Sequence, residues 1–262
     1  MPLDIDRHAH IASPIQRWDP RLKIFSLLVF VFGVALLKTL PAALCALVVA
    51  ALVLRTASLP FHFVSHGMEA AGLFLLPFFL IMPFSYPGVP AFHVLGMGFS
   101  WEGLRFATLI FTKAMTIILG SFIMFGTARF DVSMIALQRL RCPAMLVQMV
   151  LFTYRYVYVF MEEMKTLNVA MRARGFVPRT NMRTFTILGG YVGTLLVRSF
   201  ERTERVYKAM LSKGYNGTFP TMVEFSWDGR DFAKAGLMLA VAVGLLAVDM
   251  AGPFHTAIQA WY

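Results

Sequence analysis

The chain has 262 residues, of which 58% are apolar, and its 24 lysines and arginines against 14 acidic residues give a net charge of +10. A mean hydropathy of +0.67 and long runs without charge exclude an ordinary soluble domain, because polar surface cannot cover continuous apolar segments in water. The basic residues are interleaved with Met, Val and Leu rather than with a base-stacking platform, so no nucleic-acid partner is expected. We predict an all-α, polytopic protein of the lipid bilayer.

Five apolar stretches are expected to span the membrane. In chain order they are residues 24–37, 41–54, 70–86, 106–128 and 235–249. The first two are short, since 14 residues at about 1.5 Å each reach roughly 21 Å across a hydrocarbon core of about 30 Å. Pro41 suits the start of a second helix and also the interruption of a single long one, so a tight hairpin and one fused helix are the alternatives.

The distribution of basic residues favours the hairpin. Under the five-span arrangement, four basic residues precede the first span, one follows the second and 16 lie in residues 127–234, whereas Lys38 alone lies on the opposite side. Because lysine and arginine mark the cytoplasmic side, the amino terminus is predicted to be cytoplasmic, in a bacterial-type inner membrane. Three regions follow: residues 1–128 with four spans, residues 129–232 in the cytosol, and residues 233–262 with the last span and an outer tail.

The cytosolic region divides into three predicted helices, residues 131–141, 143–173 and 184–212. The second is apolar enough to suggest a sixth span, but Arg155 lies well inside it. We expect it instead to lie at the membrane interface or against its neighbour.

The third predicted helix is amphipathic over its second half. One apolar face is expected to pack on the second helix or on the span ends, and it contains Leu196, Phe200, Thr203, Tyr207 and Met210. On the other face, Glu201 precedes Arg205 and Glu204 precedes Lys208 by four residues, which is the favourable order for helical ion pairs.

A seven-residue pattern occurs twice at the ends of the two long helices. Residues 170–176 read Ala-Met-Arg-Ala-Arg-Gly-Phe and residues 209–215 read Ala-Met-Leu-Ser-Lys-Gly-Tyr, 39 positions later, and Glu162 and Glu201 have the same offset. A basic residue followed by glycine is typical of a helix C-terminal cap, which explains each copy separately. The repetition itself favours docking onto a two-fold partner that presents the same groove twice.

These repeats resemble a known family of transport proteins. Ala173-Arg174-Gly175 resembles the first Ala-Arg-Gly signature of the transmembrane T component of energy-coupling factor (ECF) transporters, and Ser212-Lys213-Gly214 resembles a relaxed second signature. The sequence Trp-Asp-Pro-Arg-Leu-Lys at residues 18–23, ahead of the first span, is similar to the CbiQ branch, which serves cobalt uptake. The match covers nearly the whole chain in order.

The resemblance implies a scaffold without its own cofactor or enzymatic activity. Its coupling helices would insert both signatures into two ABC-type ATPase subunits, which bind the ATP, and would pass their motion to a separate substrate-binding membrane subunit that holds the metal. The resemblance leaves open whether a small accessory membrane subunit is present. It also leaves nickel or a vitamin as alternative substrates. The chain has no Gly-x-x-x-x-Gly-Lys-Ser/Thr loop, so ATP binding in the P-loop manner is not expected. The second signature has serine and lysine in place of alanine and arginine, which predicts a weaker or differently shaped contact with its ATPase groove than the first signature makes.

Charged and kinked positions inside the spans suggest structural roles. Lys113 is costly at its depth unless it is paired, hydrated or snorkelling, and Asp249 is a candidate partner by depth, so the two are predicted to brace helices. Pro77 and Pro83 are expected to bend the third span.

Two rival functions use other residues. A membrane enzyme built on His62, Ser65 and His66 would be active without an ATPase, but it lacks a supporting third group. A stand-alone channel or carrier would move metal by itself. His8 and His10 have no further clustered ligands, so no metal site is predicted there.

Overall fold

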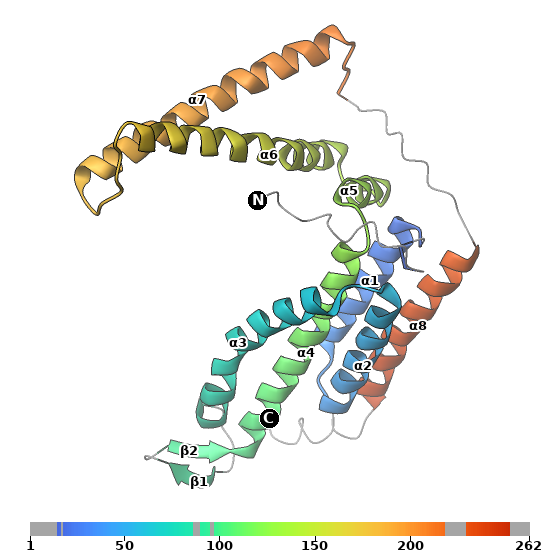
Figure 1. Cartoon of the computed structure of the whole chain (residues 1–262). Coiled ribbons are helices and arrows are strands. Elements are labelled where there is room, and N and C mark those ends of the chain that lie inside the picture. Colours follow the sequence, from blue (N-terminus) through green and yellow to red (C-terminus); the bar gives the residue numbers. More distant parts are fainter. Residues whose placement is uncertain (1–14, 17, 86–89, 95–96, 218–228, 252–262) are drawn as a thin grey trace. The chain divides into compact units, whose positions relative to one another are not determined.

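The computed structural model describes residues 15–16, 18–85, 90–94, 97–217 and 229–251 (Figure 1). The chain divides into two compact units. One contains α1 to α4, the beginning of α5 and α8, and the described part of the other contains the end of α5, α6 and α7. Apart from one two-stranded hairpin, every regular element in these residues is a helix, which confirms the all-α prediction.

The predicted helices are present, and several begin earlier than their apolar runs. Their bounds are α1 (Pro20–Leu36), α2 (Leu40–Ala57), α3 (Phe61–Ser85), α4 (Trp101–Gly126), α5 (Phe130–Arg139), α6 (Ala144–Ala173), α7 (Met182–Ser212) and α8 (Gly229–Ala251). At α1 the reason is a cap: Asp19 accepts a hydrogen bond of 2.9 Å from the Arg21 N–H, and Pro20 occupies the first helical position.

The first two helices form the predicted hairpin. Residues 37–39 separate α1 from α2, and the chain reverses its direction there (Figure 1). The alternative of one fused helix is therefore wrong. Asp249 of α8 contacts Lys38 and Thr39 at this reversal.

We call the unit that contains α1 to α4 and α8 the membrane unit. Its central helix is α4, which packs on α1, α2 and α3, while α8 packs on α1 and α2. Small residues permit these close approaches. A Cβ atom at Gly103 would lie 2.5 Å from the carbonyl oxygen of Met82, and one at Gly120 would lie 2.9 Å from a methyl group of Val31. Helix α2 contributes a row of buried alanines, Ala42, Ala43, Ala46, Ala50 and Ala57.

A short β-hairpin that the sequence analysis did not predict joins α3 to α4. Strand β1 (Pro90–Val94) pairs antiparallel with β2 (Met97–Ser100). Ser100 then caps α4, because its hydroxyl oxygen accepts hydrogen bonds from the backbone N–H groups of Glu102 and Gly103. The helix therefore begins five residues before the apolar run. As expected from Pro77 and Pro83, Figure 1 shows α3 changing direction along its length.

Five described helices are long and apolar enough to cross a membrane, and they are α2, residues 62–85 of α3, α4, α6 and α8. This set differs from the five predicted spans. It omits α1, which has only 17 residues, and it includes α6, which we assigned to the interface because of Arg155. Length and composition do not distinguish a spanning helix from an apolar one packed at the interface, so the assignment of α6 stays a prediction.

Candidate functional site

The first repeat forms a glycine-capped helix end, which we call the first tip (Ala173–Gly175). Helix α6 ends at Ala173, and Gly175 follows with φ of +78°. The Phe176 N–H donates to the Met171 carbonyl at 3.1 Å, and the Gly175 N–H donates to the Arg172 carbonyl at 3.0 Å. This pair of bonds is the Schellman cap, which satisfies carbonyls that the helix leaves unpaired.

The second repeat forms the same cap, which we call the second tip (Ser212–Gly214). Gly214 has φ of +83°. The Tyr215 N–H donates to Met210 at 3.0 Å and the Gly214 N–H donates to Leu211 at 2.9 Å. The two tips therefore share a backbone conformation as well as a sequence pattern, and Arg174 and Lys213 occupy equivalent positions.

Replacing the cap glycines should test how strongly the conformation of the tips depends on them. Added Cβ atoms at Gly175 and Gly214 would meet nothing within 4 Å, so only the left-handed backbone opposes a side chain. We expect Gly175→Ala or Gly214→Ala to destabilise its tip by about 1 kcal/mol, seen as faster amide exchange in residues 171–177 or 210–216. Gly193→Ala, inside α7 and also without neighbours within 4 Å, is the matched control and should not accelerate exchange at either tip.

The basic side chains of the two tips are exposed to a partner. Arg174 and Lys213 are exposed, and among the described residues neither side chain makes a hydrogen bond or an ion pair. Ser212 differs from its counterpart Ala173 in carrying a hydroxyl, which donates to the Lys208 carbonyl at 3.0 Å. The second tip therefore presents a lysine, which lacks the planar set of hydrogen-bond donors that arginine has. The hydroxyl beside it already donates a hydrogen bond within the helix.

The two tips lie at opposite ends of one helical pair. Helices α6 and α7 run antiparallel: the Tyr191 hydroxyl donates to the Met164 carbonyl, while Tyr215, just past the second tip, donates to Gln148 near the start of α6. A helix of 30 residues is about 45 Å long. The tips are consequently too far apart for one groove to hold both (Figure 1).

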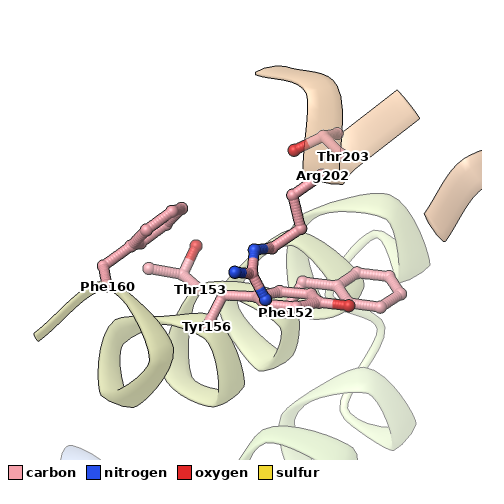
Figure 2. A pocket seen from close by; sticks show the side chains of 6 residues that line it. All are labelled: Phe152, Thr153, Tyr156, Phe160, Arg202 and Thr203. Carbon is pink, nitrogen blue, oxygen red and sulfur yellow. The ribbon is translucent and has the colours of Figure 1, made fainter. Parts of the chain in front are cut away.

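A carboxylate on α6 holds the pair together near its middle. Glu163 accepts a hydrogen bond of 3.2 Å from Arg198 and lies 3.6 Å from Arg202. Figure 2 shows Arg202 extending from α7 toward the aromatic side chains of α6, among them Phe152 and Tyr156. The sequence analysis singled out Glu162, which is exposed, and missed Glu163. The available signal was spacing, since Glu163 shares a helical face with Tyr156 and Phe160.

The predicted ion pairs on α7 are present. Glu201 lies 3.9 Å from Arg205 and Glu204 lies 2.7 Å from Lys208. All four side chains are at least half exposed, so these pairs support the helix only modestly.

The apolar face of α7 is largely exposed and does not pack on α6, which was one of the two expected arrangements; packing on the span ends stays a prediction. Leu196 is 66% exposed, Phe200 73% and Tyr207 51%. The contacts with α6 come from a neighbouring face that includes Tyr191, Arg198 and Arg202. The apolar spacing alone does not reveal which face of α7 meets α6.

Lys113 and Asp249 both contact the α1–α2 hairpin, but they do not pair directly. The Lys113 ammonium donates to the Ala35 carbonyl at 3.0 Å. Asp249 accepts hydrogen bonds from the backbone N–H groups of Lys38 and Thr39, each at 2.8 Å, and from the Thr39 hydroxyl. The cation thus meets the carboxyl end of α1 and the carboxylate meets the amino end of α2, as the helix dipoles favour.

Comparison with known proteins identifies the family. A family model, CbiQ, described as cobalt transport protein, matches residues 12–224. This chain belongs to the CbiQ family.

Similar proteins carry related names. The chain is 22% identical over 243 residues to the energy-coupling factor transporter transmembrane protein EcfT of Heliobacterium modesticaldum, covering 88% of this chain and 91% of that protein. It is 25% identical to an EcfT of Bacillus selenitireducens over 92% of this chain and 94% of the relative. It is 27% identical to the cobalt transport protein CbiQ of Rhodobacter capsulatus, over 44% of this chain and 46% of the relative. The protein is thus a membrane component of a transport system.

The residues of the rival functions do not form a paired site in the described part of this CbiQ-family chain. No group of three or more His, Cys, Asp or Glu side chains there is placed to hold a metal ion. The Ser65 hydroxyl donates to the His62 carbonyl at 3.2 Å rather than to an imidazole, so the nucleophile and base of the rival hydrolase are not paired. His8 and His10 lie outside the described residues.

Proposed function

We propose that this chain is the T scaffold of an ECF importer for a transition-metal cation, with cobalt as the substrate. The observation that carries the proposal is the pair of identical glycine caps, each presenting an exposed cation, at opposite ends of one antiparallel helix pair. Two such ends suit two copies of one partner. The partners are two ABC-type ATPases, which bind the ATP.

Arg174 and Lys213 are proposed to dock into equivalent grooves of the two ATPases. Arginine donates a planar fork to carboxylates or exposed carbonyls, whereas lysine offers a point charge. The first tip is therefore the stronger anchor. When the ATPases close on ATP, the two grooves move relative to each other, and the helix pair carries that motion as a lever.

A separate substrate-binding membrane subunit is proposed to receive the motion and to hold the metal. Support comes from the unpacked apolar stripe on α7, which includes Leu196 and Phe200 and suits a partner that is itself apolar. A nickel or vitamin substrate is the alternative within the same architecture. We propose that the amino terminus and both tips lie in the cytosol and that the protein lies in the inner membrane.

Uptake by reconstituted vesicles tests this proposal. Vesicles would contain this chain alone, this chain with the substrate subunit, or the complete set with both ATPases, and would receive Co²⁺ or Ni²⁺ with ATP or a non-hydrolysable analogue. We expect accumulation only with the complete set and ATP, and with Co²⁺ preferred. Metal flux through this chain alone would favour a carrier or channel, and accumulation of Ni²⁺ in place of Co²⁺ would reassign the substrate without changing the scaffold role.

A further inference from the structure

A lysine at the start of α1 is fully buried without a carboxylate partner. Lys23 has no exposed surface. Its ammonium donates to the Thr127 hydroxyl at 3.1 Å and to the Thr127 carbonyl at 3.3 Å. Within the described residues, no Asp or Glu oxygen lies within 4.0 Å of it. Thr127 is the C-cap of α4, so this side chain ties the first turn of α1 to the end of α4.

The same turn of α1 is also tied to the start of α8. The Asp19 backbone N–H donates to the Asp231 carboxylate at 3.0 Å. Asp231 lies in the first turn of α8 and is 6% exposed, and it also accepts from Lys234 at 3.0 Å. Asp19 itself is buried, and its carboxylate pairs with Arg21 at 2.7 Å. All of these residues belong to the membrane unit.

These two attachments lie on either side of the part of the chain that forms α6 and α7. The chain leaves the membrane unit within α5, after Ala136, and α8 is the first described helix after its return. Thr127 lies between α4 and α5, and Asp231 lies in the first turn of α8. The segment Asp19–Lys23 therefore contacts the end of α4 and the start of α8.

We propose that Asp19–Lys23 is a clamp that makes the end of α4 and the start of α8 move as one block. Lys23 is the positioning residue of this clamp. The clamp is a separate proposal from the docking of the tips. It rests on the proposed function only because one of its tests measures transport. Without the clamp, a force on α6 and α7 would displace α4 and α8 separately. With it, the displacement reaches α1, α4 and α8 together.

Stability alone does not account for Lys23. Burying an ammonium group against neutral acceptors is costly, and an apolar side chain of similar length would fill the same volume without that cost. What the ammonium supplies is a directional bond to one particular residue on another helix. Thr127 would keep a partner without it, because its hydroxyl also donates to the Ile123 carbonyl at 2.6 Å.

The test compares Lys23→Met and Thr127→Val with Arg55→Met. Arg55 is an exposed cation in the last turn of α2, and its substitution removes charge without touching the clamp. Each variant is purified as the full complex, and two quantities are measured: metal taken up per ATP hydrolysed in vesicles, and amide exchange in residues 124–134 and 229–235. Thr127→Val keeps the carbonyl acceptor, so it remains informative if Lys23→Met assembles poorly.

We expect Lys23→Met to retain its ATPases, to exchange faster in both segments and to take up about tenfold less metal per ATP, the factor equivalent to one charge-assisted hydrogen bond. Thr127→Val should show a smaller change of the same kind, and Arg55→Met none. The clamp would be overturned if amide exchange is unchanged or becomes faster in only one of the two segments. It would also be overturned if metal uptake falls only in proportion to ATP hydrolysis. If the wild-type chain binds no ATPase, the proposed function fails, while the exchange measurement still decides the clamp.

Discussion

Reversing both tip charges in one chain, with Arg174→Glu and Lys213→Glu, should abolish binding of the ATPases and ATP-driven uptake while leaving membrane insertion intact. Both side chains are exposed and make no hydrogen bond or ion pair with the described part of the chain, so their replacement removes no internal polar interaction. Losing one partner of a buried, hydrogen-bonded charge pair at an interface costs about 2–5 kcal/mol. Each loss corresponds to a reduction of at least about 30-fold in the affinity for one ATPase.

The single variants should differ in strength. Arg174→Glu is expected to weaken co-purification of the ATPases more than Lys213→Glu, because arginine makes a bidentate contact that lysine cannot reproduce. Arg174→Lys should likewise lose affinity, and Lys213→Arg should retain or gain it. Quantitative co-purification from detergent, scaled to the amount of this chain in the membrane, measures all four variants.

Arg172→Glu supplies the matched control. Arg172 is exposed in the last turn of the same helix, but its counterpart in the second repeat is Leu211, so it is outside the shared pattern. We expect it to keep most of the ATPase binding. If the double reversal binds the ATPases as well as wild type does, the tips are only helix caps, and if Arg172→Glu is equally damaging, general positive charge rather than the signature is responsible.

Local signals predicted the helix ends well. Glycine after a basic residue is sufficient to predict the caps at Gly175 and Gly214, because each cap depends on residues within one turn of the chain. The ion pair between Glu204 and Lys208 was predictable for the same reason. The charge distribution favoured the α1–α2 hairpin over a fused helix, whereas Pro41 suited both, and neither signal indicated what holds the hairpin in place.

Tertiary interactions were not predictable from the same patterns. The spacing around Glu163 shows only which face of α6 it shares. It does not indicate that Arg198 and Arg202, on another helix, converge on it. The apolar stripe of α7 predicted packing against α6 or the span ends, but spacing shows only which side chains share a face, not what covers that face. Lys23 was counted as one of several basic residues before a span, whereas its burial depends on α4.

Removing the carboxylate of Asp249 should destabilise the membrane unit, because this side chain accepts three hydrogen bonds at the start of α2. We expect Asp249→Ala to cost about 2–4 kcal/mol, since the Thr39 N–H and hydroxyl would lose their acceptor while remaining partly buried. Asp249→Asn should cost roughly half as much, because the amide keeps one acceptor oxygen but must turn an NH₂ group toward a backbone donor.

Thermal unfolding of the purified chain in detergent measures this cost, and a loss of that size should lower the melting temperature by about 5–10 °C. Glu69→Ala is the control, because Glu69 is an exposed carboxylate inside α3 whose removal should change the stability by less than about 0.5 kcal/mol. Lys113→Met should be intermediate, since it removes one hydrogen bond, to the Ala35 carbonyl, whereas Asp249 accepts three. An Asp249→Ala variant as stable as Glu69→Ala would mean that residues 37–39 are held by helix packing alone, and that the carboxylate does not anchor the hairpin.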